Sequence, residues 1–225
     1  MEKPPYTEVF LHGVETWVFD LDNTLYPSTA RLFDQINIQM TCFISETLKV
    51  SSEHANALRR DLWERHGTTM TGLATEYGID PDTFLRECHR LDLSGLEHDP
   101  GLARKISGLS GRSIVHTNGP RAHADRVLAA RGLEECFDHV IAIEDTRYRS
   151  KPAPEAFALA HSLAALNPRS SVMIEDHVEN LREPKRLGMR TVWLAPADQG
   201  EAPDYVDLKI RDLASFLDVL GPEER

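Results

Sequence analysis

The second half of the chain alternates short apolar segments with segments of helical periodicity, and this alternation restricts the possible folds more than any other feature. Four β-rich segments recur there, and a helical pattern follows each of the first three: SIVHT (113–117), HVIAI (139–143), SVMIE (171–175) and RTVWL (190–194). A fifth β-rich segment, VETWVFD, lies at 14–20. Strands that alternate with helices are typical of a parallel sheet covered on both faces. The sequence therefore predicts an α/β fold with a doubly wound parallel sheet.

The region between the first two of these strands is about 65 residues long and contains no convincing strand. Apolar residues recur there at steps of three and four residues, as expected of amphipathic helices. We therefore expect a single α/β core that carries an all-helical insertion after its first strand. The expected boundaries are 1–27 and 94–225 for the core and 28–93 for the insertion.

Charge and composition exclude several classes of partner. The formal net charge of -11 disfavours nucleic acid and anionic membranes, because both need a basic surface. The three cysteines are scattered and lack CxxC spacing, which is typical of free thiols in a reducing compartment. The first residues have no apolar signal region, and no stretch approaches the roughly 18 apolar residues of a membrane span. We therefore expect a cytoplasmic protein.

Chemically useful side chains stand where the predicted strands end. Ligands of open parallel sheets bind beyond the carboxyl ends of the strands. The residues expected at that edge are acidic, hydroxyl, amide and ammonium side chains: Asp20, Asp22, Thr117, Asn118, Lys151, Glu175 and Asp176. Each alone fits a solvated strand end, but together and in this order they indicate one site.

This set of side chains suits the transfer of a phosphoryl group. Asp20 can attack phosphorus and divide the hydrolysis into two displacements. A carboxylate that approaches a phosphate needs a cation between them, and Asp20 and Asp176 supply the oxygen ligands that Mg²⁺ prefers. Lys151 would neutralise further charge, and the Thr117 hydroxyl with the Asn118 backbone N–H would bind the transferring group.

Asp22 is the expected acid and base. It follows Asp20 by two residues, so on a strand-like segment both side chains would project to the same side. Asp22 would protonate the leaving oxygen and later deprotonate the attacking water. We expect the neighbouring negative charge to raise its pKa enough for the acid role.

Four segments resemble the four motifs of the haloacid dehalogenase-like (HAD) superfamily of phosphatases: FDLDNTLY (19–26), HTNG (116–119), KPAPEAF (151–157) and MIEDHVEN (173–180). The resemblance covers essentially the whole chain. It implies a Rossmann-like core with a helical cap, an aspartyl-phosphate intermediate and Mg²⁺ as cofactor. By this likeness Asp20 is the nucleophile, Asp22 the acid and base, Thr117 the phosphate-binding hydroxyl and Lys151 the neutralising lysine.

The same resemblance implies a ligand set for the metal. Asp176 would bind it beside Asp20 and the backbone carbonyl of Asp22. Many family members carry a second acidic residue where this chain has Asn180. Two arrangements remain open, since either Asn180 orients a metal-bound water or Glu175 supports the metal from outside its ligand sphere.

Within the superfamily, the chain is most similar to the pyrimidine 5'-nucleotidase group. The similar segments are HGTTMTGL (66–73), IDPDTFLRECHRLDL (79–93) and NGPRAHADRVL (118–128). The resemblance implies a pyrimidine nucleoside 5'-monophosphate as the small phosphate ester. Hydroxyls of the Gly-Thr-Thr segment can hydrogen-bond a base or a sugar, although a polar loop between helices would read the same way. The candidate substrate residues are His66, Thr68, Thr69, Arg121 and His123, with both histidines expected at the mouth of the pocket.

Other functions share part of this pattern. A phospho-acceptor signalling domain also sets acidic residues, a hydroxyl and a lysine at strand ends, but it needs no helical insertion. A dehalogenase needs neither a metal nor the acid at position 22. A phosphomutase with a similar cap, or a phosphatase for another sugar or organic phosphate, remains a possible alternative. The oligomeric state is not indicated.

Overall fold

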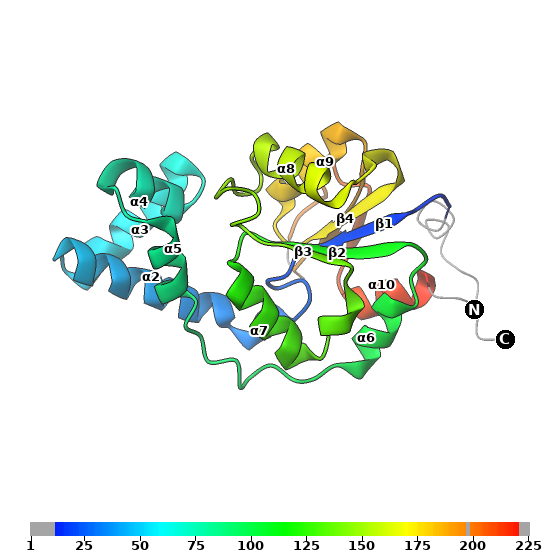
Figure 1. Ribbon diagram of the computed structural model, residues 1–225, viewed down its shortest axis with the longest axis horizontal. Helices are drawn as coiled ribbons and strands as arrows, with labels where there is room; N and C mark the ends of the chain where they lie inside the picture. The colour runs from blue at the N-terminus through cyan, green and yellow to red at the C-terminus, as the bar shows by residue number, and fades with distance from the viewer. Residues whose placement is uncertain (1–11, 197–198, 221–225) are drawn as a thin grey trace. The chain divides into compact units, whose positions relative to one another are not determined.

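The computed structural model describes residues 12–196 and 199–220. It divides into two compact units, one formed by Met1–Pro27 with Leu96–Arg225 and the other by Ser28–Gly95. The first unit, the core, contains a parallel sheet with helices, and the second, the cap, is helical (Figure 1). The predicted α/β class with a doubly wound parallel sheet is confirmed.

The core sheet has six strands in the order β3-β2-β1-β4-β5-β6, and every neighbouring pair is parallel. The strands are β1 (Thr16–Phe19), β2 (Arg112–His116), β3 (His139–Ile141), β4 (Ser171–Glu175), β5 (Arg190–Leu194) and β6 (Leu208–Ile210). All four residues of β1 are buried. The strand order runs outward from β1 in both directions, so the switch point that binds ligands in such sheets lies at the carboxyl end of β1.

The register brings the functional strand ends to one level. Phe19 aligns with Val115 of β2 and with Ile174 of β4. The backbone N–H of Asp20 donates to the carbonyl of Ile174 across 2.9 Å, which extends the ladder by one residue beyond β1. Asp20 and Glu175 therefore emerge side by side at the carboxyl edge of the sheet.

Helices cover both faces of the core sheet. In Figure 1, α8 and α9 lie on one face, and α6, α7 and α10 lie on the other. Their bounds are α6 (Pro100–Ser107), α7 (Arg121–Arg131), α8 (Pro154–Ala164), α9 (Arg182–Leu187) and α10 (Leu213–Leu220), with short 3-10 turns η2 (Glu134–Cys136), η3 (Pro168–Ser170) and η4 (Val178–Leu181). The central strands are buried between these helices, with Trp17, Phe19 and Ile174 at 2% exposure or less.

The structure contains a strand that the sequence patterns did not predict. β6 pairs in parallel with β5 at the edge of the sheet. It is only three residues long, and its middle residue is Lys209. Because so short a segment shows neither an apolar run nor a readable alternation, its pairing depends on the edge that β5 offers.

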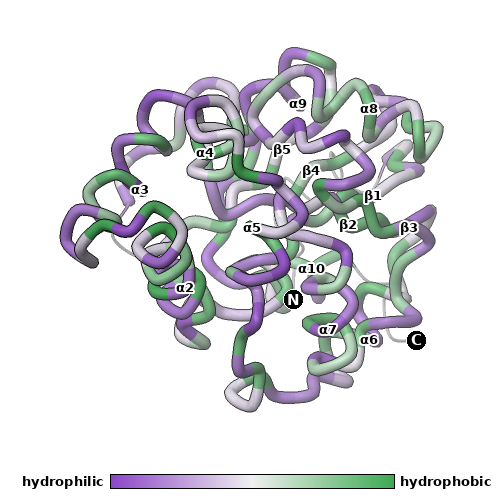
Figure 2. Tube along the Cα trace, turned by 60° about the vertical axis from the view of Figure 1, so that its left-hand side comes forward, coloured by the Kyte–Doolittle hydropathy of each residue, from purple (hydrophilic) through white to green (hydrophobic). Residues whose placement is uncertain are grey.

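The cap consists of η1 (Ser28–Ala30), α2 (Leu32–Leu48), α3 (Ser52–His66), α4 (Thr69–Tyr77) and α5 (Pro81–Cys88). Its centre is apolar, with Ile44, Leu62 and Leu73 fully buried. Phe43 and Phe84 join α2 to α5 through an edge-to-face contact with ring centroids 5.3 Å apart. Hydrophilic and hydrophobic stretches alternate along these helices in Figure 2, as expected where each helix buries one face. Within the described residues, no helix has the length and apolar character needed to cross a bilayer.

Candidate active site

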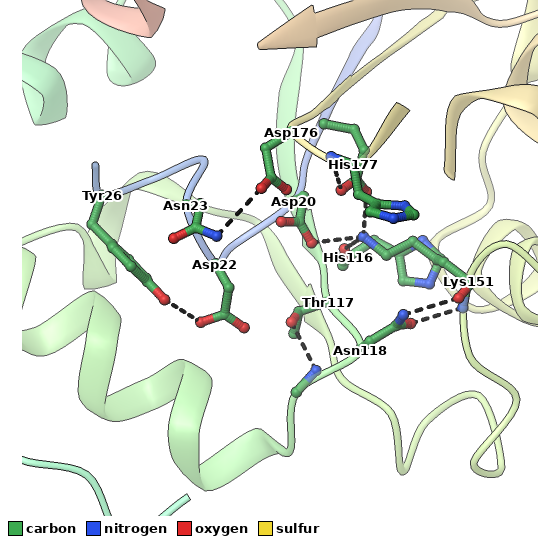
Figure 3. A network of polar contacts seen from close by, with 12 residues as sticks. Asp20, Asp22, Asn23, Tyr26, His116, Thr117, Asn118, Lys151, Asp176 and His177 are labelled. Atoms are coloured by element: carbon green, nitrogen blue, oxygen red, sulfur yellow. Dashed lines mark hydrogen bonds and ion pairs between the residues drawn. The ribbon is translucent and has the colours of Figure 1, made fainter. Parts of the chain in front are cut away.

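Lys151 lies at the centre of the buried charges beyond the sheet edge (Figure 3). Its Nζ donates to Asp20 Oδ1 at 2.6 Å, to Glu175 Oε2 at 2.7 Å and to the carbonyl of His116 at 2.8 Å. These three bonds use all three ammonium protons. Burial lowers the pKa of Lys151, but the charges of Asp20 and Glu175 outweigh burial and raise it above its usual value. Lys151 is therefore a fixed positive charge against Asp20.

The side chain of Asn118 places Lys151. Asn118 Nδ2 donates to the backbone carbonyl of Lys151 at 3.0 Å, and the backbone N–H of Lys151 donates to Asn118 Oδ1 at 2.7 Å. This reciprocal pair connects the loop after β2 to the loop after β3. We expected only the backbone N–H of Asn118 to act, on the phosphate. The amide side chain instead holds the backbone of Lys151 in place, a role that the sequence motif alone does not indicate.

Three carboxylates gather around this lysine. Ligand oxygens of Asp20, Glu175 and Asp176 all lie within 4.8 Å of one another. Burial, followed by the charge of Glu175, raises the pKa of Asp20 to about 8. Burial, followed by the charge of Asp20, raises the pKa of Asp176 to about 6, and burial also raises the pKa of Glu175. One ammonium thus lies beside three carboxylates, of which those of Asp20 and Glu175 are buried and that of Asp176 is half-buried.

A divalent cation fits this imbalance. The donors are carboxylate oxygens, which Mg²⁺ prefers, and a second positive charge would relieve the repulsion that raises the pKa values. Asn23 Nδ2 donates to Asp176 Oδ2 at 3.3 Å and so orients one of the candidate ligands. Asn180 is buried in η4, and its backbone N–H donates to the carbonyl of His177. Of the two residues considered as support for the metal, Glu175 lies within the acidic cluster. A role for Asn180 at the metal stays a prediction.

Asp22 lies in a turn and not on a strand. β1 ends at Phe19, and the backbone N–H of Leu25 closes a turn on the carbonyl of Leu21 at 2.9 Å. The strand periodicity that we used to place Asp22 therefore does not apply. In Figure 3 the turn nevertheless sets the Asp22 carboxylate between Tyr26 and Thr117.

Two buried side chains hold this carboxylate. The Tyr26 hydroxyl donates to Asp22 Oδ1 at 2.7 Å, and His123 Nε2 lies 2.7 Å from the same oxygen. Burial, followed by the charge of Asp22, raises the pKa of Tyr26 far above its usual value, so its hydroxyl remains a donor. Neither contact was predicted. A signal for Tyr26 existed in its spacing of four residues from Asp22, but nothing in the sequence connects His123 to Asp22.

Thr117 and Gly119 border the space beside Asp22. Thr117 is buried, and its Oγ1 accepts a hydrogen bond from the backbone N–H of Gly119 at 2.9 Å. A Cβ added at Gly119 would lie 3.3 Å from Thr117 Oγ1 and 3.5 Å from Asp22 Oδ2. Both oxygens thus lie close to Gly119, and a side chain there would crowd Thr117 and also His123, whose Cδ2 lies 3.2 Å from the added Cβ.

The remaining predicted substrate residues already have partners within their own unit. Arg121 pairs with Asp145 and also donates to a carbonyl of β3. His123 is not at an exposed pocket mouth, because it is 1% exposed and lies against Asp22. In the cap, His66 contacts Glu76.

The two cap threonines also serve the local structure. Thr68 is the N-cap of α4, where its Oγ1 accepts from the backbone N–H of Thr71 at 3.0 Å. Thr69 is 4% exposed, and its hydroxyl donates to the carbonyl of Arg59 at 3.0 Å. Of the two, Thr68 is the less buried. Their proposed contact with a substrate stays a prediction.

Comparison with known proteins agrees with this geometry. A model of the haloacid dehalogenase-like hydrolases matches residues 14–188. Pyrophosphatase PpaX of Halalkalibacterium halodurans is 29% identical over 117 residues, which are 49% of this chain and 53% of that protein. Phosphate metabolism protein 8 of Saccharomyces cerevisiae is 24% identical over 191 residues, which are 78% of this chain and 60% of that protein. The chain thus spans little more than half of the length of these curated relatives.

The fold is also similar to that of a solved protein. The crystal structure of a HAD phosphatase from Thermococcus onnurineus matches with a TM-score of 0.64 and 20% identity. The match covers 92% of this chain and 98% of that one. At this identity the likeness concerns the fold alone. It includes both the sheet and the helical unit, since so little of either chain lies outside the match.

Proposed function

Because the chain belongs to the haloacid dehalogenase-like hydrolases, we propose that it is a Mg²⁺-dependent phosphatase that forms an aspartyl phosphate on Asp20. The observation that carries this proposal is the contact of Asp20 with Lys151 beside two further carboxylates. A buried carboxylate held against a lysine, with a nearby site for a divalent cation, is the arrangement that attack on a phosphate requires.

The residues of the chain divide the reaction into two displacements. An oxygen of Asp20 attacks phosphorus, the bond from phosphorus to the leaving oxygen breaks, and Asp22 gives that oxygen a proton. Water then attacks the phosphorus of the aspartyl phosphate, and Asp22 takes a proton from it as the Asp20 oxygen leaves. The Thr117 hydroxyl would hydrogen-bond the phosphoryl oxygens, and the charge of Lys151 would neutralise part of the negative charge beside them.

Mg²⁺ would be held by Asp20 and Asp176, with the backbone carbonyl of Asp22 as a third ligand. When bound, it supplies the positive charge that lets two anions approach each other. Glu175 would stabilise the site through Lys151, which it contacts at 2.7 Å. Lys151 would therefore contact both the nucleophile, Asp20, and the residue that supports the metal site, Glu175.

The substrate that we propose is a small phosphate monoester, with a pyrimidine nucleoside 5'-monophosphate as the specific candidate. The cap segments similar to pyrimidine 5'-nucleotidases support that candidate. Neither curated relative above has a nucleotidase name, and the cap threonines have local partners. A phosphatase for another small sugar or organic phosphate is therefore the second candidate. The free thiols of Cys42, Cys88 and Cys136 support our placement of the enzyme in the cytoplasm.

A panel of phosphate esters tests both levels of this proposal. Phosphate release would be measured from nucleoside monophosphates, sugar phosphates, pyrophosphate and p-nitrophenyl phosphate, with Mg²⁺ and with EDTA. Asp20→Asn is the control, because the amide keeps the shape and cannot attack. Activity of this variant near the wild-type level, or full activity after complete chelation, would overturn the phosphatase proposal. Preference for a sugar phosphate would overturn only the nucleotide candidate.

A further inference from the structure

Tyr26 and His123 reach Asp22 from two different parts of the core. Tyr26 follows the turn that begins after β1, and His123 lies in the first turn of α7, 101 residues from Asp22. Both side chains are buried, at 2% and 1% exposure. Both contact the same oxygen, Oδ1, at 2.7 Å. Burial of two polar groups on one carboxylate oxygen fixes its orientation, because rotation of the carboxylate would break both bonds.

We propose that Tyr26 and His123 are positioning residues that keep the transferable proton of Asp22 on Oδ2. This inference rests on the phosphatase function proposed above. The phenol hydroxyl donates to Oδ1, and with its Nε2 protonated the imidazole donates to Oδ1 as well. An oxygen that accepts from two donors directs its lone pairs to them and has no direction left for a proton of its own. When Asp22 is an acid, its proton must therefore lie on Oδ2.

The second oxygen faces the place where proton transfer would occur. Oδ2 and Thr117 Oγ1 both lie beside Gly119, at 3.5 Å and 3.3 Å from the position of an added Cβ, which also lies 3.2 Å from His123 Cδ2. Thr117 is the residue that would bind the transferring phosphoryl group. An oxygen leaving phosphorus there would meet the Oδ2 proton directly.

The proton balance follows from this placement. In the first displacement, the bond from phosphorus to the leaving oxygen breaks and the Oδ2 proton moves to that oxygen. In the second, water forms a bond to phosphorus and Oδ2 accepts one of its protons. Oδ1 keeps its two hydrogen bonds in both steps, so Asp22 never has to rotate between its two roles. Tyr26 and His123 themselves exchange no proton.

If Tyr26 and His123 had a purely structural role, their replacement would lower the turnover of all substrates equally. Substrates with different leaving groups therefore distinguish a structural role from the positioning role. An alkyl phosphate needs a proton on its leaving oxygen, whereas p-nitrophenyl phosphate needs little help. We expect Tyr26→Phe to lower kcat for an alkyl phosphate by up to about tenfold, the effect of one lost hydrogen bond, with KM nearly unchanged. The kcat for p-nitrophenyl phosphate should change less than about twofold.

Two variants of His123 separate the effect of its N–H donor from the effect of its side-chain volume. His123→Leu should lower kcat for the alkyl phosphate as Tyr26→Phe does, and His123→Gln, which keeps an N–H donor, should recover part of the loss. Tyr205→Phe is the matched control. It removes a hydroxyl that donates to a carboxylate at 2.8 Å, that of Glu179, outside the site. Tyr205→Phe should leave kcat unchanged for both the alkyl phosphate and p-nitrophenyl phosphate.

The ratio of alkyl to aryl turnover keeps the test decisive even if a variant folds poorly, because the folded fraction cancels from the ratio. Equal losses on both substrates in Tyr26→Phe and His123→Leu would overturn the inference while the phosphatase function stands. In an Asp22→Asn background, which has no proton to place, Tyr26→Phe should cost no further activity. A further tenfold loss there would also overturn it. Loss of the phosphatase function itself would appear separately, as activity that persists in Asp20→Asn.

Discussion

Lys151 Nζ lies 2.6 Å from Asp20 Oδ1, so the carboxylate that we propose as the nucleophile has a charged partner before any substrate binds. The same ammonium contacts Glu175 at 2.7 Å, and neither lysine nor glutamate exceeds 2% exposure. A buried pair of this kind is costly to break, because removal of one partner leaves the other charge uncompensated. Under the proposed mechanism, catalysis and folding would therefore depend on the same contact.

Replacement of Lys151 should reduce both activity and stability. We expect Lys151→Met to lower phosphate release to background and to lower the free energy of unfolding by about 3–5 kcal/mol, measured by urea denaturation in EDTA. Adding Glu175→Gln should recover part of the stability and none of the activity, because one unpaired buried charge is removed. Lys185→Met, which breaks an exposed pair with Asp207, is the control and should cost little. A Lys151→Met protein as stable as the wild type would contradict this account.

The metal-free protein should lose stability as the pH rises toward 8. The pKa of Asp20 is raised to about 8 and that of Asp176 to about 6, from a usual value of 3.8. The folded state thus holds protons more tightly than the unfolded state, so stability decreases as pH rises from the unfolded pKa to the folded one. Each proton involved contributes at most about 1.4 kcal/mol per pH unit.

Buried histidines give the opposite slope, which defines the window for the measurement. Burial lowers the pKa of His116 and His161 below 6.5, so their contribution is complete above that pH and is lost only on acidification. Thermal unfolding between about pH 7 and 8 therefore isolates the carboxylates. We expect Tm to fall across this window in EDTA and to stay level in Mg²⁺. Asp20→Asn should abolish most of the decline, and an unchanged decline in this variant would contradict the assignment.

Asp176 should control the affinity for the metal. Asp176→Asn replaces a charged ligand with a neutral amide, so the Mg²⁺ concentration for half-maximal activity should rise by at least about tenfold. Calorimetric titration with Mg²⁺ measures the same loss without turnover. Glu179→Gln is the control, since Glu179 pairs with Arg182 and Tyr205 away from the acidic cluster. Equal Mg²⁺ affinity in both variants would remove Asp176 from the ligand set.

The convergence of Asp20, Lys151 and Glu175 could be predicted because parallel strands end at a common edge. The apolar runs of β1 and β4 stop at acidic residues, Lys151 lies in the loop after β3, and the topology brings these residues together. The register of β1 against β2 and β4 agrees with this reasoning. The one edge strand that was missed, β6, is too short to give a pattern.

The surroundings of Asp22 could not be predicted in the same way. Its contact with His123 joins residues 101 positions apart and depends on how the first turn of α7 docks against the turn after β1. No periodicity specifies that docking. The side-chain bonds of Asn118 to the backbone of Lys151 have the same character, because they depend on the path of two loops. Strand order can be inferred from a pattern, whereas contacts between loops need the three-dimensional structure.

Thr68 and Thr69 should differ in their effect on base preference. If the cap selects pyrimidine nucleotides through a hydroxyl, the partly exposed Thr68 is better placed than Thr69, whose hydroxyl is buried on the carbonyl of Arg59. Thr68→Val should then lower the ratio of kcat/KM for UMP over AMP by up to about tenfold, with p-nitrophenyl phosphate unaffected. Thr68→Ser keeps the hydroxyl and should keep the ratio.

Stability separates this effect from the loss of the helix cap. Thr68 accepts from Thr71 at the start of α4, so Thr68→Val should also cost about 1 kcal/mol of stability. Thr69→Val removes a buried hydrogen bond and should cost a similar amount while leaving the UMP-to-AMP ratio unchanged. Equal changes of the ratio in both variants would assign the effect to a distorted cap. Wild-type turnover of AMP and GMP as fast as that of UMP and CMP would end the pyrimidine proposal and leave the phosphatase proposal standing.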